Sequence, residues 1–240
     1  TGTHLVDGFK SAEATFRFLV GDETLPSEPA QVVGAYVYHS AWAGQGDAVD
    51  TSKSLALEGS EPHQLNFDNL INTAQGINGL VFDVHNLAHP SQISTGDFEF
   101  QWSPVGAYDP SGHPPGNWQI APDPSSIQVS GGAPSRILLQ WPNGTIMNRW
   151  LRLTLKSTAT IGLESSEVYY IGHLLGKTTV TPGDEFAVSF ADVVPIRSNV
   201  GQVVDSSSTI DIDKSGTVSF GDISAMRGNI GTQLPRINVP

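Results

Sequence analysis

The chain has 240 residues, of which 24 are acidic and 12 basic, giving a formal net charge of −12. Phosphate binding requires clustered Lys and Arg, so this charge argues against nucleic acid and anionic membranes as partners. The absence of cysteine excludes disulfides, thiolate metal sites and cysteine nucleophiles. No apolar run approaches the roughly 20 residues of a membrane span, so membrane insertion is not expected.

Short apolar runs alternate with Gly- and Pro-rich turns along residues 14–172, a pattern typical of an all-β sandwich or barrel. In the run Arg149–Lys156, three leucines alternate with Arg152, Thr154 and Lys156, which predicts a strand with one buried face. We therefore expect a mainly β fold, with a β-sandwich of jelly-roll type over residues 1–176. Residues 1–30 would add an extra strand or a linker. The predicted strands are Ala14–Val20, Gln31–His39, Gly79–Asn86, Asp97–Trp102, Ser126–Val129, Arg136–Trp141, Arg149–Lys156 and Val168–Gly172.

A turn signal lies between two of these strands. Asn143 and Gly144 both tolerate positive φ, and they separate the runs that end at Trp141 and begin at Ile146. The dipeptide predicts a β-hairpin.

The pattern changes after Gly172. Ser189 and Ser219 are each followed three residues later by an aspartate, the spacing of a capping box that starts a helix. The fourteen-residue segments that begin at Val188 and Val218 also match at a constant offset of 30 residues. Pro195 should kink or shorten the first helix. Residues 177–240 are thus predicted to form two tandem loop–helix units.

The segment from Asp211 to Asp222 has the ligand spacing of an EF-hand-type calcium loop. Positions 1, 3, 5, 9 and 12 carry oxygen-bearing side chains, and glycine stands at position 6. Position 7 would contribute a backbone carbonyl. Ca²⁺ takes six to eight oxygen ligands, and three anionic ones predict moderate affinity. The predicted ligands of a single Ca²⁺ are Asp211, Asp213, Ser215, Thr217, Ser219 and Asp222.

The first copy of the loop lacks most of these features. At the 30-residue offset, Thr181, Gly183 and Glu185 stand at positions 1, 3 and 5, and Phe186 replaces the glycine of position 6. A second complete site is therefore not expected, although Asp184, Glu185 and Asp192 offer the ligands of an irregular one.

At these residues the chain resembles a dockerin type I domain, a pair of calcium-loop–helix units. The segments that begin at Val33, Gln75 and Val168 also resemble a β-rich module that precedes dockerin-like repeats in large secreted planctomycete proteins. The first resemblance implies a non-catalytic adaptor that binds a cohesin-like partner outside the cell. Asp211, Asp213, Ser215, Thr217 and Asp222 match the dockerin ligands. Lys177 departs from the pattern, because this kind of module tends to have an acidic residue there.

Flat aromatic rings offer a different function, because sugar binding uses them. Trp118 and Tyr108 lie in a Pro- and Gly-rich loop over residues 108–124, and Trp150 shares the predicted exposed face of its strand with Arg152. No Gly-x-Ser-x-Gly motif, phosphate loop or Ser/His/Asp combination stands out, so an enzyme is not expected. Two hypotheses remain: a non-catalytic secreted module for adhesion, scaffolding or docking to a cohesin-like or other extracellular protein, and a carbohydrate-binding module of a polysaccharide-degrading enzyme.

Overall fold

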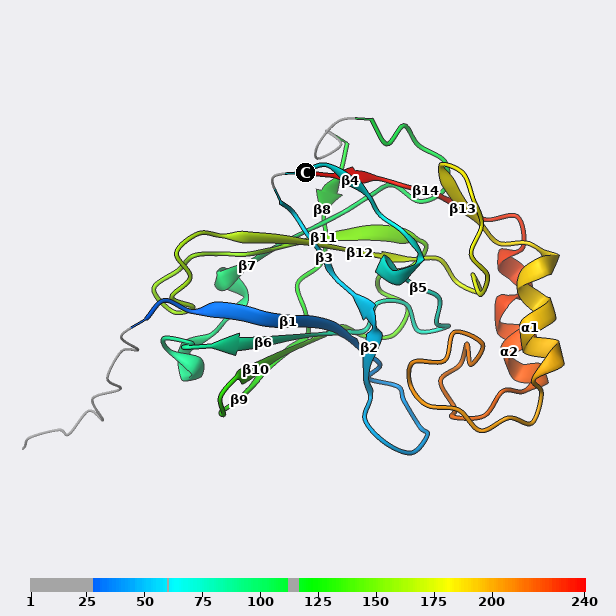
Figure 1. The fold of residues 1–240 in the computed structure, drawn as a ribbon, viewed down its shortest axis with the longest axis horizontal. Coiled ribbons are helices and arrows are strands. Elements are labelled where there is room, and N and C mark those ends of the chain that lie inside the picture. Colours follow the sequence, from blue (N-terminus) through cyan, green and yellow to red (C-terminus); the bar gives the residue numbers. More distant parts are fainter. Residues whose placement is uncertain (1–27, 60, 112–116) are drawn as a thin grey trace, which may run out of the picture.

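The computed structural model describes residues 28–59, 61–111 and 117–240, and the predicted strand Ala14–Val20 lies outside these ranges. The described chain is mainly β, with several antiparallel sheets and two short α-helices (Figure 1). Single 3-10 turns interrupt the connections at η1 (Phe67–Asn69), η2 (Pro90–Gln92), η3 (Thr95–Asp97), η4 (Phe190–Asp192) and η5 (Arg227–Asn229).

The first sheet has five antiparallel strands in the order β2-β1-β6-β10-β9. Alternate residues of its central strand β6, among them Phe82, lie in the apolar core, whereas Asp83 on the opposite face is half-buried. Arg136 of β10 forms a bidentate ion pair with Asp83 of β6, with nitrogen–oxygen distances of 2.7 and 2.9 Å. The two residues lie directly opposite each other, so the ion pair favours this register of the two strands. The strand bounds are β1 (Gln31–Tyr38), β2 (Val49–Ser54), β6 (Gly79–His85), β9 (Ser126–Ser130) and β10 (Ser135–Gln140).

The second sheet has six strands. Five of them follow the order β3-β12-β11-β7-β8, and the sixth, β5, pairs with β12 in parallel. Its centre is β11, whose leucines are buried while Arg152 and Thr154 on the other face are half-buried, as the alternation predicts. The bounds are β3 (Ala56–Leu57), β5 (Leu70–Ile71), β7 (Phe98–Trp102), β8 (Gln119–Ile120), β11 (Arg149–Leu155) and β12 (Glu167–His173).

The two sheets pack face to face around a shared apolar core. The first sheet contributes Phe82 and Leu139, and the second contributes Phe100 and Leu153. Phe82 meets Tyr169 edge to face, with ring centroids 5.2 Å apart. We call these two sheets with their connections the two-sheet unit.

Residues 177–240, the C-terminal segment, lie against the outer face of the second sheet. Helices α1 (Val193–Ser198) and α2 (Phe220–Met226) lie side by side at one end of the molecule (Figure 1). Strands β13 (Glu185–Ala187) and β14 (Gln233–Pro235) form a two-stranded sheet, and β15 (Asn238–Val239) pairs with β4 (His63–Gln64). A second apolar core joins this segment to the sheet face that carries Trp150 and Tyr170.

Helices α1 and α2 are related by reciprocal contacts. The Val188 N–H donates to Thr232 O and the Val188 carbonyl accepts from Gly231 N, at 3.0 and 2.8 Å. Val218 makes the equivalent pair with Gln202 and Gly201, at 2.9 and 2.8 Å. Ser219 caps α2, as predicted. Ser189 instead caps the 3-10 turn η4, and α1 begins only at Val193, without a side-chain cap.

The predicted hairpin at Asn143-Gly144 is wrong. Strand β10 pairs with β6 and β9, whereas β11 pairs with β7 and β12 in the other sheet. The turn at Gly144, with φ +78°, therefore connects the two sheets. The dipeptide correctly marks a turn, but a turn signal does not say which strands pair.

Candidate metal centre

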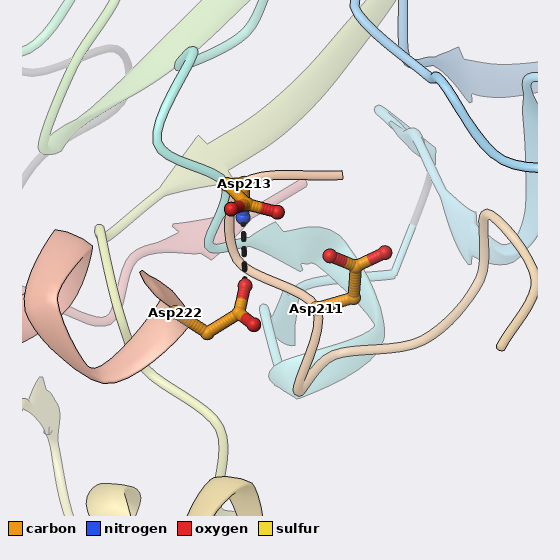
Figure 2. Close-up of side chains that lie close together, drawn as sticks. All are labelled: Asp211, Asp213 and Asp222. Atoms are coloured by element: carbon orange, nitrogen blue, oxygen red, sulfur yellow. Dashed lines mark hydrogen bonds between the residues drawn. The ribbon is translucent and has the colours of Figure 1, made fainter. Parts of the chain in front are cut away.

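Three carboxylates of the predicted calcium loop lie together. Asp211, Asp213 and Asp222 each offer a carboxylate oxygen, and these oxygens lie within 4.8 Å of one another (Figure 2). Asp211 and Asp222 are buried and Asp213 is half-buried. Asp213 comes from the loop and Asp222 from the first turn of α2, so the centre joins the loop to the helix. This group can hold a metal ion.

Backbone hydrogen bonds hold the loop in a tight turn around Asp211. Its Oδ1 accepts the Ser215 N–H at 3.1 Å, and its Oδ2 accepts the Gly216 N–H at 2.8 Å. The turn requires positive φ at Lys214 (+58°) and Gly216 (+86°), and glycine adopts such values without a steric cost. The glycine of position 6 is therefore explained by the backbone.

The remaining predicted ligands contact either one another or a carboxylate of the cluster. The Ser215 hydroxyl donates to the Thr217 carbonyl at 3.2 Å, so the oxygens of positions 5 and 7 are neighbours. The Ser219 hydroxyl caps α2 by accepting the Gly221 N–H at 3.0 Å, and it lies 3.2 Å from Asp222 Oδ2. Ser219 is thus used as a helix cap beside the centre.

The electrostatics of the cluster favour a cation. Burial raises the pKa of Asp211 to about 6, and the nearby charge of Asp222 acts in the same direction. Lys214 does not neutralise the cluster by direct contact, because its ammonium donates to the carbonyls of Ser206 and Ser208 at 2.8 and 2.7 Å. Burial also lowers the pKa of Lys214 to about 8. Buried carboxylates of like charge are stabilised by a hard cation that oxygen ligands surround.

The two-sheet unit holds three consecutive residues of the loop. The Ala74 N–H donates to Ile212 O at 2.7 Å, Gln75 Nε2 donates to Asp213 O at 2.8 Å, and the Ala43 N–H donates to Lys214 O at 3.0 Å. No motif in the sequence indicates these contacts, because the partners lie more than 130 residues apart along the chain.

Close backbone packing adds to these hydrogen bonds. A Cβ on Gly216 would lie 2.6 Å from the Gly44 Cα, so the two loops meet glycine to glycine. Gly216 therefore has two roles, the positive φ of the turn and the contact with the loop around Gly44.

The predicted alignment of the first repeat is wrong at the start of its loop. Asp192, the counterpart of Asp222, accepts backbone N–H groups from Thr178 and Thr179, both at 2.9 Å, and not from the residues around Thr181. Asp184 and Glu185 are exposed and lie outside this contact. The offset of 30 residues therefore holds for the helices but not for the beginning of the loops.

The predicted exposure of Trp150 is wrong, and the second candidate tryptophan, Trp118, is buried as well. Trp150 is 0% exposed, and its Nε1 donates to the Pro235 carbonyl at 2.8 Å. Trp118 is 9% exposed and meets Tyr170 edge to face at 6.2 Å. The face of β11 that carries Trp150 was assigned correctly, but the C-terminal segment covers it. Tyr108 is half-buried beside an open depression of about 540 Å³ that Asp184 and Glu185 also line.

Comparisons with known proteins leave the metal centre as the main functional observation. No family model, curated protein or solved structure matches the chain. Within the described ranges, none of the helices has the length and apolar character needed to cross a membrane.

Proposed function

We propose that the protein is a non-catalytic extracellular module for adhesion, scaffolding or docking, stabilised by one Ca²⁺. In this proposal the two-sheet unit is a β-sandwich and the C-terminal segment is a dockerin-like pair of loop–helix units. The observation that carries it is the convergence of Asp211, Asp213 and Asp222 in a loop that also has the ligand spacing of a calcium site. Ca²⁺ would join the loop to the start of α2, because its ligands come from both.

A calcium titration of the chelated protein tests this proposal. We expect one Ca²⁺ per chain by isothermal titration calorimetry, and a melting temperature that rises with calcium. At 100-fold excess over the dissociation constant, the ion adds about 2.7 kcal/mol to the free energy of unfolding. The double substitution Asp211→Asn with Asp213→Asn should abolish the shift, because it removes two charges while keeping polar side chains. Asp205→Asn, in an exposed turn of the same segment, is the matched control. A wild-type protein that melts identically with calcium and with chelator contradicts the proposal.

An exposed apolar surface on the helix pair supports docking to a protein. Phe190 and Phe220 occupy equivalent positions at the two helix starts and are 76% and 68% exposed, and Val194 of α1 is 60% exposed. The start of each helix packs against the end of the other, so Phe190 and Phe220 lie at opposite ends of the helix pair. In this proposal the partner is an extracellular protein of cohesin-like type with apolar patches that cover these rings, because exposed apolar side chains lose contact with water only against an apolar surface.

The docking part of the proposal has its own test. A panel of purified cohesin domains and a glycan array are probed with the calcium-loaded protein. We expect binding to a cohesin-like domain that weakens at least tenfold when Phe190 and Phe220 are replaced by alanine, since central apolar anchors carry much of the binding energy of such interfaces. Val203→Ala, at another exposed apolar position, serves as the control. Binding to glycans alone favours the carbohydrate-binding hypothesis, which now depends on Tyr108 because Trp118 and Trp150 are buried.

A further inference from the structure

The first repeat contains a fully buried ion pair at the place that corresponds to the metal centre of the second. Lys177 Nζ lies 3.1 Å from Asp192 Oδ1 and 3.3 Å from Asp192 Oδ2, and both side chains are 0% exposed. The ammonium also donates to the Thr179 hydroxyl at 3.3 Å. A lysine ammonium and a carboxylate are rarely buried so completely unless they are paired.

Backbone hydrogen bonds establish which residues of the two repeats correspond. Oδ1 of Asp192 accepts the N–H groups of Thr178 and Thr179, and Oδ1 of Asp222 accepts those of Ile212 and Asp213, at 2.7 and 3.0 Å. The other oxygen, Oδ2, accepts the N–H of Ser189 at 2.8 Å in the first repeat and of Ser219 at 2.7 Å in the second. The two aspartates therefore accept equivalent backbone N–H groups on the same carboxylate oxygens.

This correspondence places Lys177 at position 1 of the first loop. Thr178 matches Ile212, so the preceding residue, Lys177, matches Asp211. Lys177 and Asp192 are 15 positions apart in the sequence (192 − 177), whereas Asp211 and Asp222 are 11 positions apart (222 − 211). The first loop therefore contains four more residues than the second. Because of these extra residues, a comparison at a constant offset hides the match.

We propose that the ammonium of Lys177 occupies the place of the metal ion in the first repeat, so that this repeat is ordered by its own cation at any calcium concentration. The inference rests on the proposed calcium site of the second repeat for its comparison. A lysine ammonium is a compact charge with three donors, and here it contacts both carboxylate oxygens and a hydroxyl. A carboxylate at position 1 would add a second negative charge beside Asp192, and an external cation would be needed to neutralise the two. Lysine instead supplies the positive charge from its own side chain.

The consequence is an asymmetric pair of units. The first unit stays assembled in chelator and presents Val188, Gly201 and Gln202 to the second through the reciprocal backbone hydrogen bonds. The second unit becomes fully ordered when its ion binds. The chain accordingly takes up one Ca²⁺ and not two.

Stability measurements in chelator test the inference separately from the calcium site. We expect Lys177→Met to lower the ratio of folded to unfolded protein by roughly 150- to 5,000-fold, because it leaves Asp192 buried without a counter-charge. The loss should be the same in chelator and in saturating calcium. Lys156→Met is the matched control, since the Lys156 ammonium donates to the Gly96 carbonyl in an exposed hydrogen bond. Equal stability of Lys177→Met and Lys156→Met in chelator would overturn the inference, whatever calcium does to the wild type.

Two further variants keep the test decisive if Lys177→Met fails to fold. The double variant Lys177→Met with Asp192→Asn removes both charges and should be more stable than Lys177→Met alone. Lys177→Asp should depend on calcium more strongly than Lys177→Met, because it places two carboxylates at positions 1 and 12. A double variant that is no more stable, an aspartate variant without added calcium dependence, or two bound ions in the wild type would each contradict the assignment.

Discussion

At the scale of single residues, His173 shows how burial selects one protonation state. Its ring is completely buried at the end of β12, where Nδ1 accepts the Asn148 N–H at 2.9 Å. The other nitrogen therefore carries the hydrogen and donates to the Thr73 carbonyl at 2.8 Å. Burial lowers the pKa of His173 to about 4, and the hydrogen bond to Thr73 only partly opposes this. The neutral ring joins three segments of the two-sheet unit.

This depressed pKa predicts a loss of stability in mild acid. In the unfolded chain the His173 pKa is near 6.5, so below that pH the unfolded state binds a proton that the folded state excludes. The contribution of the neutral ring is fully present above pH 6.5 and is lost as the pH falls toward 4, by about 1.4 kcal/mol per pH unit. Urea unfolding at pH 7, 6 and 5 in saturating calcium measures this slope.

His173→Gln is the variant that isolates the effect. Glutamine keeps a donor for the Thr73 carbonyl but does not titrate, so the variant is expected to be less stable at pH 7 and to have a flatter pH dependence. His39, whose pKa burial also lowers, contributes equally to both proteins and cancels in the comparison. Parallel pH profiles for wild type and variant would show that His173 does not control the acid sensitivity.

At the scale of elements, the calcium loop is shaped partly by segments distant in sequence. The carbonyls of Ile212, Asp213 and Lys214 each accept a hydrogen bond from the two-sheet unit. Residues that orient the ligands of a metal commonly affect its affinity as well. The bond from Gln75 is the most accessible to mutation, because its donor is a side chain.

Replacing Gln75 with alanine should weaken calcium binding without preventing folding. A typical hydrogen bond contributes about 1 kcal/mol, which corresponds to roughly a fivefold increase in the dissociation constant. Isothermal titration calorimetry measures the change. Gln128→Ala is the control, since Gln128 makes an exposed side-chain contact with Gln140 in the first sheet, away from the loop. An unchanged affinity in Gln75→Ala would mean that the loop reaches its geometry without this support.

Strands with clear apolar patterns were predictable from the sequence, whereas short or polar ones were not. The seven predicted strands within the described ranges correspond to β1, β6, β7, β9, β10, β11 and β12, and no end differs by more than one residue. Strand β2 was missed because its sequence Val-Asp-Thr-Ser-Lys-Ser has no apolar alternation and it lies at a sheet edge. The two-residue strands are determined by their partners and carry no pattern of their own.

The candidate site shows the same division between local and distant information. The convergence of Asp211, Asp213 and Asp222 follows from their spacing in one loop, and local sequence was enough to predict it. Trp150 is buried by residues that lie some 35 to 90 positions later in the sequence. The alternation in β11 therefore predicted which face of the strand carries Trp150, but not that the C-terminal segment packs against that face. The role of Lys177 was hidden for a third reason, because four extra residues shift the first loop out of the repeat.

At the scale of the whole molecule, the C-terminal segment is joined to the two-sheet unit at several separate places. Asn72 Nδ2 donates to the carbonyls of Lys177 and Thr209 at 2.8 and 2.7 Å, and so reaches both loop–helix units at once. Asn148 contacts Asn229, and β15 pairs with β4. The apolar core around Trp150 connects these places, so neither part exposes its inner face in the folded chain.

This interlocking predicts that calcium stabilises the entire chain in a single cooperative transition. Thermal unfolding is followed by far-ultraviolet circular dichroism, which reports the sheets, and by the fluorescence of tryptophans in both apolar cores. Because the two cores share the second sheet, both signals should give the same midpoint with chelator and shift together when calcium is added. Trp150→Ala removes the ring between the core and the C-terminal segment and should separate the two signals, with a loss of about 3–5 kcal/mol. Two wild-type transitions, of which only one responds to calcium, would instead mean that the ion stabilises the C-terminal segment alone.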